Sequence, residues 1–296
     1  MEIVDVLRFV AGHPLNKHRK ISALLNFIKW QVGIRLISSV VVFEWINGAK
    51  FFVRRGETGL TGNVYAGLHE YSDMAFVLHF LRKDDLFVDV GANSGSYTIL
   101  ACAAVGCEGY AFEPIFSTYQ NLTENLRLNH LENRVTALNV GVGAAVGEIA
   151  FTTGLDTVNH AVSTSDTGAQ SVMVPIVPLD EVLADRNPTM IKIDIEGYET
   201  PAIEGALRTL RESSLKAVIM ELNGSGARYG FNEAKILEIM KELGFESFSY
   251  DPISRTLVSL QGKNLTSGNT LFIRDQQFVC ARLESAPRVV VHDKSI

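Results

Sequence analysis

From Leu86 onward, continuous apolar runs alternate with amphipathic segments, and turns that contain glycine separate many of them. A continuous apolar run is typical of a strand that is covered on both faces, and the amphipathic segments are typical of helices. This alternation predicts an α/β fold with a mostly parallel, doubly wound sheet, in which ligands bind beyond the carboxyl ends of the strands. The predicted strands are 86–90, 109–113, 134–140, 190–195, 216–222 and 246–250, with closing antiparallel strands at 255–260 and 269–274.

The first eighty residues have a different pattern. Apolar residues recur at helical spacing over residues 4–10 and again over 22–36, and Asn47-Gly48 supplies the positive φ angles of a tight hairpin turn. We therefore predict an N-terminal extension of helices and a hairpin (residues 1–83), which would pack over the ligand as a lid. The remainder divides into a core (84–275) with an inserted hairpin at about 144–180, and a C-terminal tail (276–296).

The composition disfavours several classes of partner and site but does not identify a function. Lys and Arg number 27 against 33 Asp and Glu, so the net charge of −6 gives no reason to expect nucleic acid or an anionic membrane as the main partner. Three cysteines without CxxC spacing indicate neither a disulfide framework nor a thiolate zinc site, which favours a reducing cytoplasm. The acidic start is not typical of a signal peptide, and the apolar run from Leu36 to Phe43 is too short to span a bilayer. The oligomeric state is left open.

The most informative segment is the loop DVGANSGSYT, which begins at Asp89. It follows a predicted apolar strand and precedes the start of a predicted helix. Gly91 and Gly95 allow a tight turn there, and their lack of a side chain lets a ligand approach the backbone closely. In a dinucleotide-binding GxGxxG loop, a second glycine would stand where this chain has Asn93, which argues against a pyrophosphate. Asp89, at the end of the strand, suits an ammonium group better than a phosphate.

A second carboxylate, Glu113, ends the next predicted strand, 18 residues after Gly95. A carboxylate at this place can accept hydrogen bonds from both hydroxyls of a ribose. An acid on the first loop and another on the second strand fit a nucleoside that carries an amino-acid tail, which predicts S-adenosylmethionine as the cofactor. An NAD(P)-dependent oxidoreductase is the alternative from a different enzyme class, and a non-catalytic binding protein that retains the fold is a third.

These segments resemble the FkbM-type methyltransferases. DVGANSGSYT, AFEP, VPLDEV and IKIDIEGYE stand in the order that this family shows, over residues 86–250. The resemblance implies a class I, Rossmann-like methyltransferase fold with a mostly parallel seven-stranded sheet, and transfer of a methyl group to oxygen, usually a hydroxyl of a sugar, glycan or secondary metabolite. Methylation of nitrogen on a small molecule is the alternative acceptor chemistry. The cofactor contacts that the resemblance implies are Asp89, Gly91, Asn93, Gly95 and Glu113.

Methyl transfer from a sulfonium is a direct in-line displacement, so holding the acceptor oxygen near the methyl carbon supplies much of the catalysis. An alcohol must also lose its proton, which a carboxylate or an imidazole can take as general base. Asp194 and Glu196 flank Ile195 at the end of a strand, and alternation would put both carboxylates on one side if the strand persists that far. We predict these two acids and His160, in the polar inserted region, as catalytic. Helix capping is the alternative for the acids, and a structural role is the alternative for the histidine.

Four further residues are candidates for binding. Glu70 precedes the first core strand, where related sequences have an acid close to the cofactor's amine, and Asn139 follows the third strand, near the usual position of the adenine in this fold. Glu221 and Asn223 end the fifth strand and are predicted to line the acceptor pocket, with loop capping as the alternative. Nothing in the spacing demands a metal ion, so none is predicted. The acceptor is expected to contact loops 56–70, 152–172 and 223–231, whose composition does not identify it.

Overall fold

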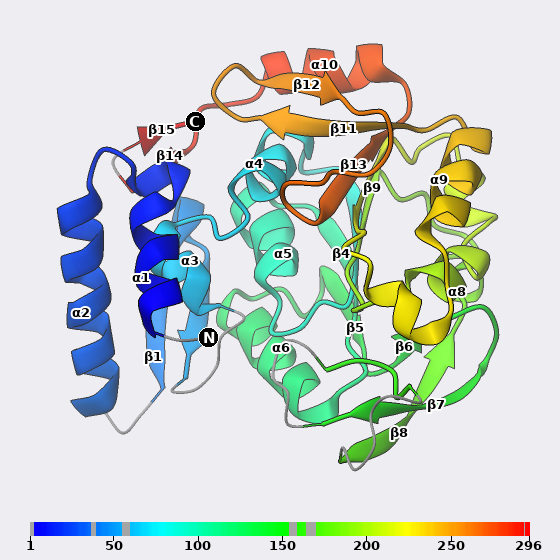
Figure 1. Ribbon diagram of the computed structural model, residues 1–296, viewed down its shortest axis with the longest axis horizontal. Helices are drawn as coiled ribbons and strands as arrows, with labels where there is room; N and C mark the ends of the chain where they lie inside the picture. Colours follow the sequence, from blue (N-terminus) through cyan, green and yellow to red (C-terminus); the bar gives the residue numbers. More distant parts are fainter. Residues whose placement is uncertain (1–2, 37–39, 55–59, 154–158, 164–169, 293) are drawn as a thin grey trace.

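The computed structural model describes residues 3–36, 40–54, 60–153, 159–163, 170–292 and 294–296 (Figure 1). Within these residues the main sheet consists of eight strands: β3 (Leu86–Val90), β4 (Glu108–Phe112), β5 (Val135–Leu138), β9 (Met190–Ile193), β10 (Ala217–Glu221), β11 (Glu246–Asp251), β12 (Thr256–Ser259) and β13 (Asn269–Ile273). Their order is β12-β11-β13-β10-β9-β3-β4-β5. The five strands from β10 to β5 run parallel, and β13 runs antiparallel to both of its neighbours.

The predicted Rossmann-like α/β fold is confirmed. The described part of the sheet has one strand more than the seven expected, because β12 pairs antiparallel with β11. The chain proceeds from β3 to β4 and β5 on one side, and then returns to add β9 and β10 on the other side. The boundary between β3 and β9 is therefore the topological switch point, where a doubly wound sheet leaves a crevice for ligands.

Helices cover both faces of the sheet. One face carries α4 (Tyr71–Phe80), α5 (Ser96–Ile99) with its π-helical continuation η3 (Leu100–Val105), α6 (Phe116–Leu128) and α10 (Gln276–Glu284). The other carries α7 (Leu179–Val182), α8 (Glu199–Glu204) and α9 (Glu233–Glu242), with the short 3-10 turns η5 (Thr209–Arg211) and η6 (Ser225–Tyr229) nearby in sequence. Side chains alternate between the two apolar clusters, so Phe87 packs on the first face and Val88 on the second. α10, which falls within the predicted tail, contributes Val279 and Leu283 to the first cluster.

The N-terminal extension lies beside this core (Figure 1). It comprises α1 (Ile3–Gly12), η1 (Pro14–Asn16), α2 (Lys20–Leu36), β1 (Val41–Glu44), η2 (Ile46–Gly48), β2 (Lys50–Val53) and α3 (Thr61–Ala66). The predicted hairpin is present, with Asn47 and Gly48 at φ of 52° and 80° in its turn. On α6, Asn125 Oδ1 accepts a hydrogen bond from the Phe52 amide at 2.8 Å, and Asn129 bonds to the amide and carbonyl of Lys50. These bonds fix β2 to the core and leave α2 on the outside.

The inserted region forms a second, three-stranded sheet. Its strands are β6 (Gly141–Val142), β7 (Gly147–Thr152) and β8 (Ser171–Val177). β7 and β8 pair antiparallel, as expected of the hairpin at 144–180, and β8 also pairs with β6 in parallel. Phe151 and Val174 pack against Ile115, which anchors this sheet beside the loop that follows β4. Parts of the predicted acceptor loops, residues 56–59, 154–158 and 164–169, lie outside the described residues.

The last residues pack against the extension. β14 (Val290–Val291) and β15 (Lys294–Ser295) form a small antiparallel pair in which Val291 is buried. The Arg255 guanidinium donates hydrogen bonds to the carbonyls of Ala286 and Ile296 at 2.6 and 3.2 Å. In the described part of the chain, no helix combines the length and the apolar character needed to cross a membrane.

Candidate active site

The glycine loop lies at the switch point, in contact with the backbone that follows β9. Gly91 has a φ of +80°, and a Cβ atom on this residue would lie 1.9 Å from the carbonyl oxygen of Asp194. The Asp194 amide donates a hydrogen bond to the Val90 carbonyl at 3.0 Å. Only glycine fits between these two backbones, so the loops after β3 and β9 form one continuous edge.

Glu113, just after β4, ties the glycine loop to its own loop. Its side chain is buried; Oε2 accepts a hydrogen bond from the Asn93 amide at 3.0 Å, and Oε1 accepts one from the Ile115 amide at 2.9 Å. Burial raises the pKa of Glu113 to about 7, although both amide donors favour the ionised form. Asn93 has a positive φ of 51° and accepts a hydrogen bond from the Ser94 amide at 2.7 Å. The two residues therefore hold the loop in one conformation.

A hollow beside the glycine loop has a polar part and an apolar part, and Gly91 borders both. The polar part is lined by Asn93, Glu113, Thr118, Asp194 and Glu196, among others. The apolar part is lined by Phe112, Pro114, Val140, Phe151, Ile195 and Tyr198, among others. A carboxylate next to an apolar slot fits a nucleoside, because ribose hydroxyls can donate to the carboxylate while a purine ring fills the slot.

Asn139 shapes this slot through backbone contacts. Its side-chain amide donates hydrogen bonds to the carbonyls of Glu113 and Pro114, both at 2.9 Å. These bonds fix the turn between β4 and α6 on which the slot depends. Direct contact between Asn139 and an adenine ring stays a prediction.

A buried cation, Lys192, lies on β9 below the hollow. Its side chain is 3% exposed, and Nζ lies 2.9 Å from Oδ2 of Asp194 and 4.7 Å from the centre of the Tyr97 ring. Asp89 is its register neighbour on β3. Burial on its own would lower the pKa of Lys192, but Asp194, Asp89 and Glu70 raise it above its usual value. Lys192 is therefore a fixed positive charge among three carboxylates.

Asp89 lies beneath the loop rather than at its surface. Its side chain is 1% exposed, and Oδ2 accepts a hydrogen bond from the Thr98 hydroxyl at 2.6 Å. Burial raises the pKa of Asp89, and Oδ1 has no hydrogen-bond partner among the described residues. That oxygen is the one atom of Asp89 with capacity for a ligand ammonium group, and contact with such a group stays a prediction.

Glu70 belongs to a network that joins the lead segment to the core. The Tyr97 hydroxyl donates to Oε2 of Glu70 at 2.7 Å, and the Asn269 amide donates to Oε1 at 2.9 Å. The same amide group lies 3.2 Å from Oδ2 of Asp73, whose pKa is raised to about 7 by burial and by the charge of Glu70. Both oxygens of Glu70 are thus already hydrogen-bonded, and its predicted contact with a cofactor amine is not tested by this geometry.

The buried ion pair gives a prediction for stability. Replacing Lys192 with Met leaves Asp89 and Asp194 without their cation, and we expect the free energy of unfolding in urea to fall by about 3 kcal/mol. Adding Asp194→Asn to this variant should restore part of the loss, because the double variant has one unpaired carboxylate fewer.

Lys216 supplies a matched control for that measurement. It also pairs with an aspartate, Asp275, at 2.8 Å and lies 5.3 Å from the centre of an aromatic ring, but both partners are partly exposed. Lys216→Met should cost less than about 1 kcal/mol. Equal losses for the two lysine variants would contradict the assignment of Lys192 as the cation that compensates buried charge.

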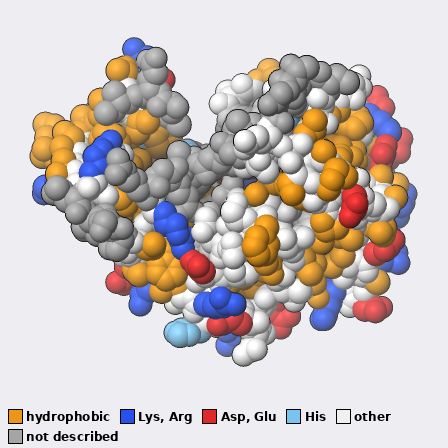
Figure 2. Space-filling view, turned by 90° about the horizontal axis from the view of Figure 1, so that it is seen from below, with side chains coloured by type: hydrophobic (Ala, Val, Ile, Leu, Met, Phe, Trp, Pro, Cys, Tyr) orange, Lys and Arg blue, Asp and Glu red, His pale blue; other side chains and the backbone are white. Residues whose placement is uncertain are grey.

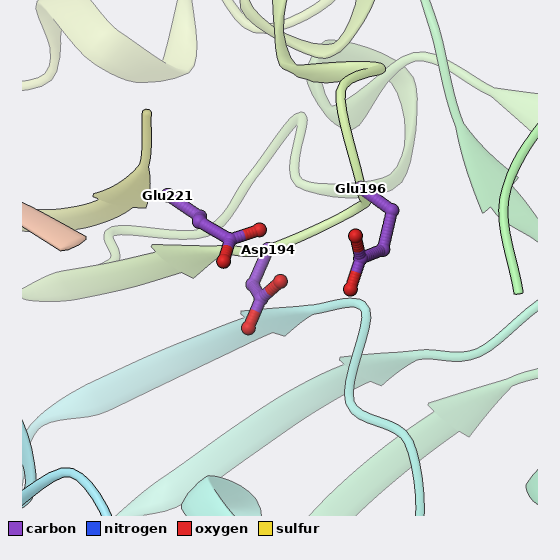
Figure 3. A group of neighbouring side chains, drawn as sticks. All are labelled: Asp194, Glu196 and Glu221. Carbon is purple, nitrogen blue, oxygen red and sulfur yellow. The ribbon is translucent and has the colours of Figure 1, made fainter. Parts of the chain in front are cut away.

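Three carboxylates converge at the carboxyl ends of β9 and β10 (Figure 3). Each of Asp194, Glu196 and Glu221 contributes one oxygen to a group whose members all lie within 4.8 Å of one another. Burial and the charges of Asp194 and Glu196 raise the pKa of Glu221 to about 9. Such a group can hold a proton, and its oxygen donors are also of the kind that Mg²⁺ or Ca²⁺ prefers. The expectation that no metal is required therefore stays a prediction.

Glu196 reaches this group through a strained turn. β9 ends at Ile193, so the strand does not persist to Glu196, and strand alternation is the wrong reason for the pairing with Asp194. Glu196 has a φ of +55°, in the left-handed region that is unfavourable for a residue with a side chain. Burial, and secondly the charge of Asp194, raise the pKa of Glu196. Strain of this kind is often maintained at functional sites.

Glu199 holds the strained turn in place. Its Oε1 accepts hydrogen bonds from the amides of Ile195 and Gly197 at 3.2 and 3.0 Å, on either side of Glu196. Burial raises the pKa of Glu199 to about 7, although the Gly197 amide favours the ionised form. Glu199 lies in the first turn of α8, and it also supports the loop that carries Glu196.

Comparison with known proteins identifies the family. The model of the FkbM methyltransferase domain matches residues 89–247, which is more than half of the chain. The chain belongs to the FkbM methyltransferase family. This membership confirms the predicted resemblance and the expectation of an S-adenosylmethionine-dependent methyltransferase domain, and it disfavours the oxidoreductase alternative.

Individual relatives of this FkbM methyltransferase are distant. Hexuronic acid methyltransferase AglP from Haloferax volcanii is 28% identical over 159 residues, which cover 52% of this chain and 62% of that protein. Among solved structures, methyltransferase FkbM from Methylobacillus flagellatus is 18% identical with a TM-score of 0.44, over 72% of this chain and 52% of that one. An S-adenosylmethionine-dependent O-methyltransferase from Thermotoga maritima is 14% identical with a TM-score of 0.37, over 68% and 62%. The chain thus spans less than two thirds of each relative.

The three remaining predicted site residues of this FkbM methyltransferase, His160, Glu221 and Asn223, lie in different surroundings. His160 is buried, and its amide donates a hydrogen bond to the Thr152 hydroxyl at 3.0 Å. Asn223 is exposed, and its Oδ1 accepts a hydrogen bond from the Ser225 amide at 2.8 Å, which is the loop-capping alternative. Glu221 lies with the acids, whereas Asn223 is occupied in its own turn. The catalytic role of His160 and the acceptor contacts of Glu221 and Asn223 stay predictions.

Sequence reasoning missed three residues of the charged network. A lysine inside the apolar run IKIDI was a usable signal for Lys192, because a charged side chain in a strand covered on both faces requires a partner. Tyr97 and Asn269 carried no such signal. They reach Glu70 from 27 and 199 residues away, and only the folded chain brings them together.

Proposed function

We propose that this protein is an S-adenosylmethionine-dependent O-methyltransferase that acts in the cytoplasm on a hydroxyl group of a sugar or glycan. The observation that carries the proposal is the strained, partly buried Glu196, whose carboxylate borders the same hollow as the glycine loop and Glu113. A relative named for hexuronic acid supports a sugar as the acceptor. Amine methylation on a small molecule remains the competing acceptor chemistry.

The residues around the hollow fit the cofactor. Glu113 would accept hydrogen bonds from the ribose hydroxyls, the slot between Pro114 and Ile195 would hold the adenine, and the glycine loop would face the amino-acid tail. The bound cofactor supplies an electrophilic methyl group on a sulfonium. The protein's contribution is then to orient the acceptor oxygen in line with that methyl group and to exclude water from the hollow.

Glu196 is the best candidate for the general base. The carboxylate of Glu196 would take the proton of the acceptor hydroxyl, while that oxygen takes the methyl group that the cofactor would supply and S-adenosylhomocysteine is left as the product. A useful base has a pKa near the working pH, and burial together with Asp194 raises the pKa of Glu196 in that direction. Lys192 pairs with Asp194 on its other side, which keeps that acid in place beside the base.

The pKa of Glu113 predicts a pH dependence for cofactor binding. With a pKa of about 7 in the free protein, Glu113 is mostly protonated at pH 6 and mostly ionised at pH 8. The ionised form accepts hydroxyl hydrogen bonds better, so affinity for S-adenosylhomocysteine should rise about tenfold from pH 6 to pH 8, with proton release on binding near pH 7. Titration calorimetry in two buffers of different ionisation enthalpy measures both quantities.

A variant without an ionisable side chain at position 113 provides the control. Glu113→Gln should bind S-adenosylhomocysteine more weakly, and with an affinity that stays constant over the same pH range. A pH-independent affinity in the unmodified protein would contradict Glu113 as the ribose ligand.

The proposed function is tested by comparing acceptors that differ only at the reacting atom. Production of S-adenosylhomocysteine would be followed with glucuronic and galacturonic acid glycosides, and with the corresponding amino sugars. Turnover on the hydroxyl series alone supports O-methylation. Turnover on the amino sugars alone would establish the N-methyltransferase alternative and remove the need for Glu196 as a base.

A further inference from the structure

The first 55 residues, which form most of the N-terminal extension, are basic in an otherwise acidic protein. Residues 1–55 contain 9 Lys and Arg and 3 Asp and Glu, whereas residues 56–296 contain 18 and 30. No acidic residue occurs between Asp5 and Glu44. The net charge of −6 is therefore the sum of +6 in the first segment and −12 in the second. Such an asymmetry, which the average conceals, indicates a partner of negative charge for the basic segment.

The same extension exposes an apolar stripe on α2. The stripe consists of Ile21, Leu25, Ile28 and Val32, which are 77%, 51%, 51% and 52% exposed. Their spacing of four, three and four residues places them on one face of the helix. The opposite face of α2 is already used, because Ala23 and Phe27 are buried against α1 and α3. Among the described residues, the contacts that hold α2 on the protein are therefore made by its other face, and the apolar stripe takes no part in them.

The position of α2 leaves the stripe accessible. Figure 1 shows α2 at the edge of the molecule, on the side of the extension away from the core, and Figure 2 shows hydrophobic and basic side chains along that edge. Lys20, Lys29 and Arg35 are exposed on the same 17-residue helix. An apolar stripe on a helix whose charged residues are all basic is the pattern of a helix that lies in the interface of an anionic bilayer.

We propose that α2 docks this protein flat on a lipid bilayer that contains anionic headgroups. The apolar stripe would enter the interface, while the basic residues of α2 would contact headgroup phosphates. The acidic remainder of the chain would be repelled from the same surface, which orients the molecule with its extension toward the lipid. The proposal is independent of the acceptor and of the methyl-transfer mechanism.

A second copy of the chain fits the stripe less well. The spacing of the stripe would suit a pair of helices, but such a pair would bring the basic residues of two α2 helices together. No acid from residue 6 to residue 43 is present to balance them. Charge therefore favours the bilayer, and self-association is the outcome to be excluded by experiment.

The test is co-sedimentation with vesicles, without cofactor or acceptor. We expect binding to vesicles of phosphatidylcholine with 30% phosphatidylglycerol, about fivefold weaker binding for Lys29→Gln, and little binding to phosphatidylcholine alone. The salt dependence should be strong, because the attraction is screened over roughly 8 Å at physiological ionic strength. A triple variant, Ile21→Gln with Leu25→Gln and Ile28→Gln, should bind at least tenfold more weakly.

The matched control changes exposed apolar residues on the acidic part of the chain. Ile253 and Leu265 are 70% and 86% exposed, so Ile253→Gln with Leu265→Gln removes comparable apolar surface and should leave vesicle binding unchanged. Equal loss in both variants, or no binding to anionic vesicles, would overturn the proposal. So would a dimer in light scattering that the triple variant converts to a monomer. Because no turnover is measured, failure here leaves the proposed function untouched.

Discussion

Glu113→Ala is expected to weaken the binding of S-adenosylhomocysteine about 100-fold or more. The carboxylate would accept both ribose hydroxyls, and each hydrogen bond to a charged group is worth about 1.5–3 kcal/mol. The substitution also removes the acceptor for the amides of Asn93 and Ile115, so the glycine loop loses the group that fixes its position. Titration calorimetry at pH 8, where the carboxylate is ionised, gives the largest contrast.

The control for this experiment lies at the other end of the same strand. Glu108 is the first residue of β4 and is exposed. Glu108→Ala therefore removes the same side chain and the same charge as Glu113→Ala, but at a position that does not line the hollow. It should bind S-adenosylhomocysteine like the unmodified protein. If Glu113→Ala binds as tightly as Glu108→Ala, the ribose is held elsewhere and the proposed cofactor position is wrong.

Glu196→Gln is expected to lower kcat by a factor of about 10²–10⁴, the usual contribution of a general base. Affinity for S-adenosylhomocysteine should change less than about threefold, because the amide occupies the same volume and Glu113 is untouched. The separation of turnover from cofactor binding is the signature of a group that acts on the acceptor. Glu181→Gln, on the exposed side of α7, is the matched control and should retain full turnover.

A second substitution at the same position tests the strain. Glycine adopts a φ of +55° without the penalty that a side chain incurs, so Glu196→Gly should leave the free energy of unfolding unchanged or increase it by up to about 1 kcal/mol. Turnover should nevertheless be lost. A stable, inactive variant would show that the chain retains a strained residue for its chemistry, whereas retained turnover would remove Glu196 from the mechanism.

The parts of the fold and site that follow local rules could be predicted from the sequence. The apolar run of β3, the glycines after it and the acid after β4 are each set by a few neighbouring residues, so the glycine turn at Gly91 and the acid Glu113 could be placed in the fold from the sequence. Their contact with a cofactor stays a prediction. Asp194 and Glu196 come together as expected, but through a left-handed turn supported by Glu199. Backbone angles of this kind depend on tertiary contacts, which no local pattern records.

Features that depend on distant segments could not be predicted in the same way. The pairing of Lys192 with Asp89 follows from the adjacency of β9 and β3, which are about a hundred residues apart in sequence. The exposure of the α2 stripe depends on which side of the helix packs against α1 and α3, and the spacing of the apolar residues does not fix that side. The net charge of −6 averages over segments whose charges have opposite sign, and this asymmetry can be read directly from the sequence.

The close contact between Gly91 and the Asp194 carbonyl limits how this enzyme can diversify. No residue larger than glycine fits at position 91 unless β3 and β9 separate and the hydrogen bond from the Asp194 amide to the Val90 carbonyl is lost. The segment that carries the proposed general base, Glu196, is thereby tied to the glycine loop that is proposed to face the cofactor. New acceptor specificities would have to evolve across the hollow, in the inserted sheet and the N-terminal extension, where sequence can change without disturbing this joint.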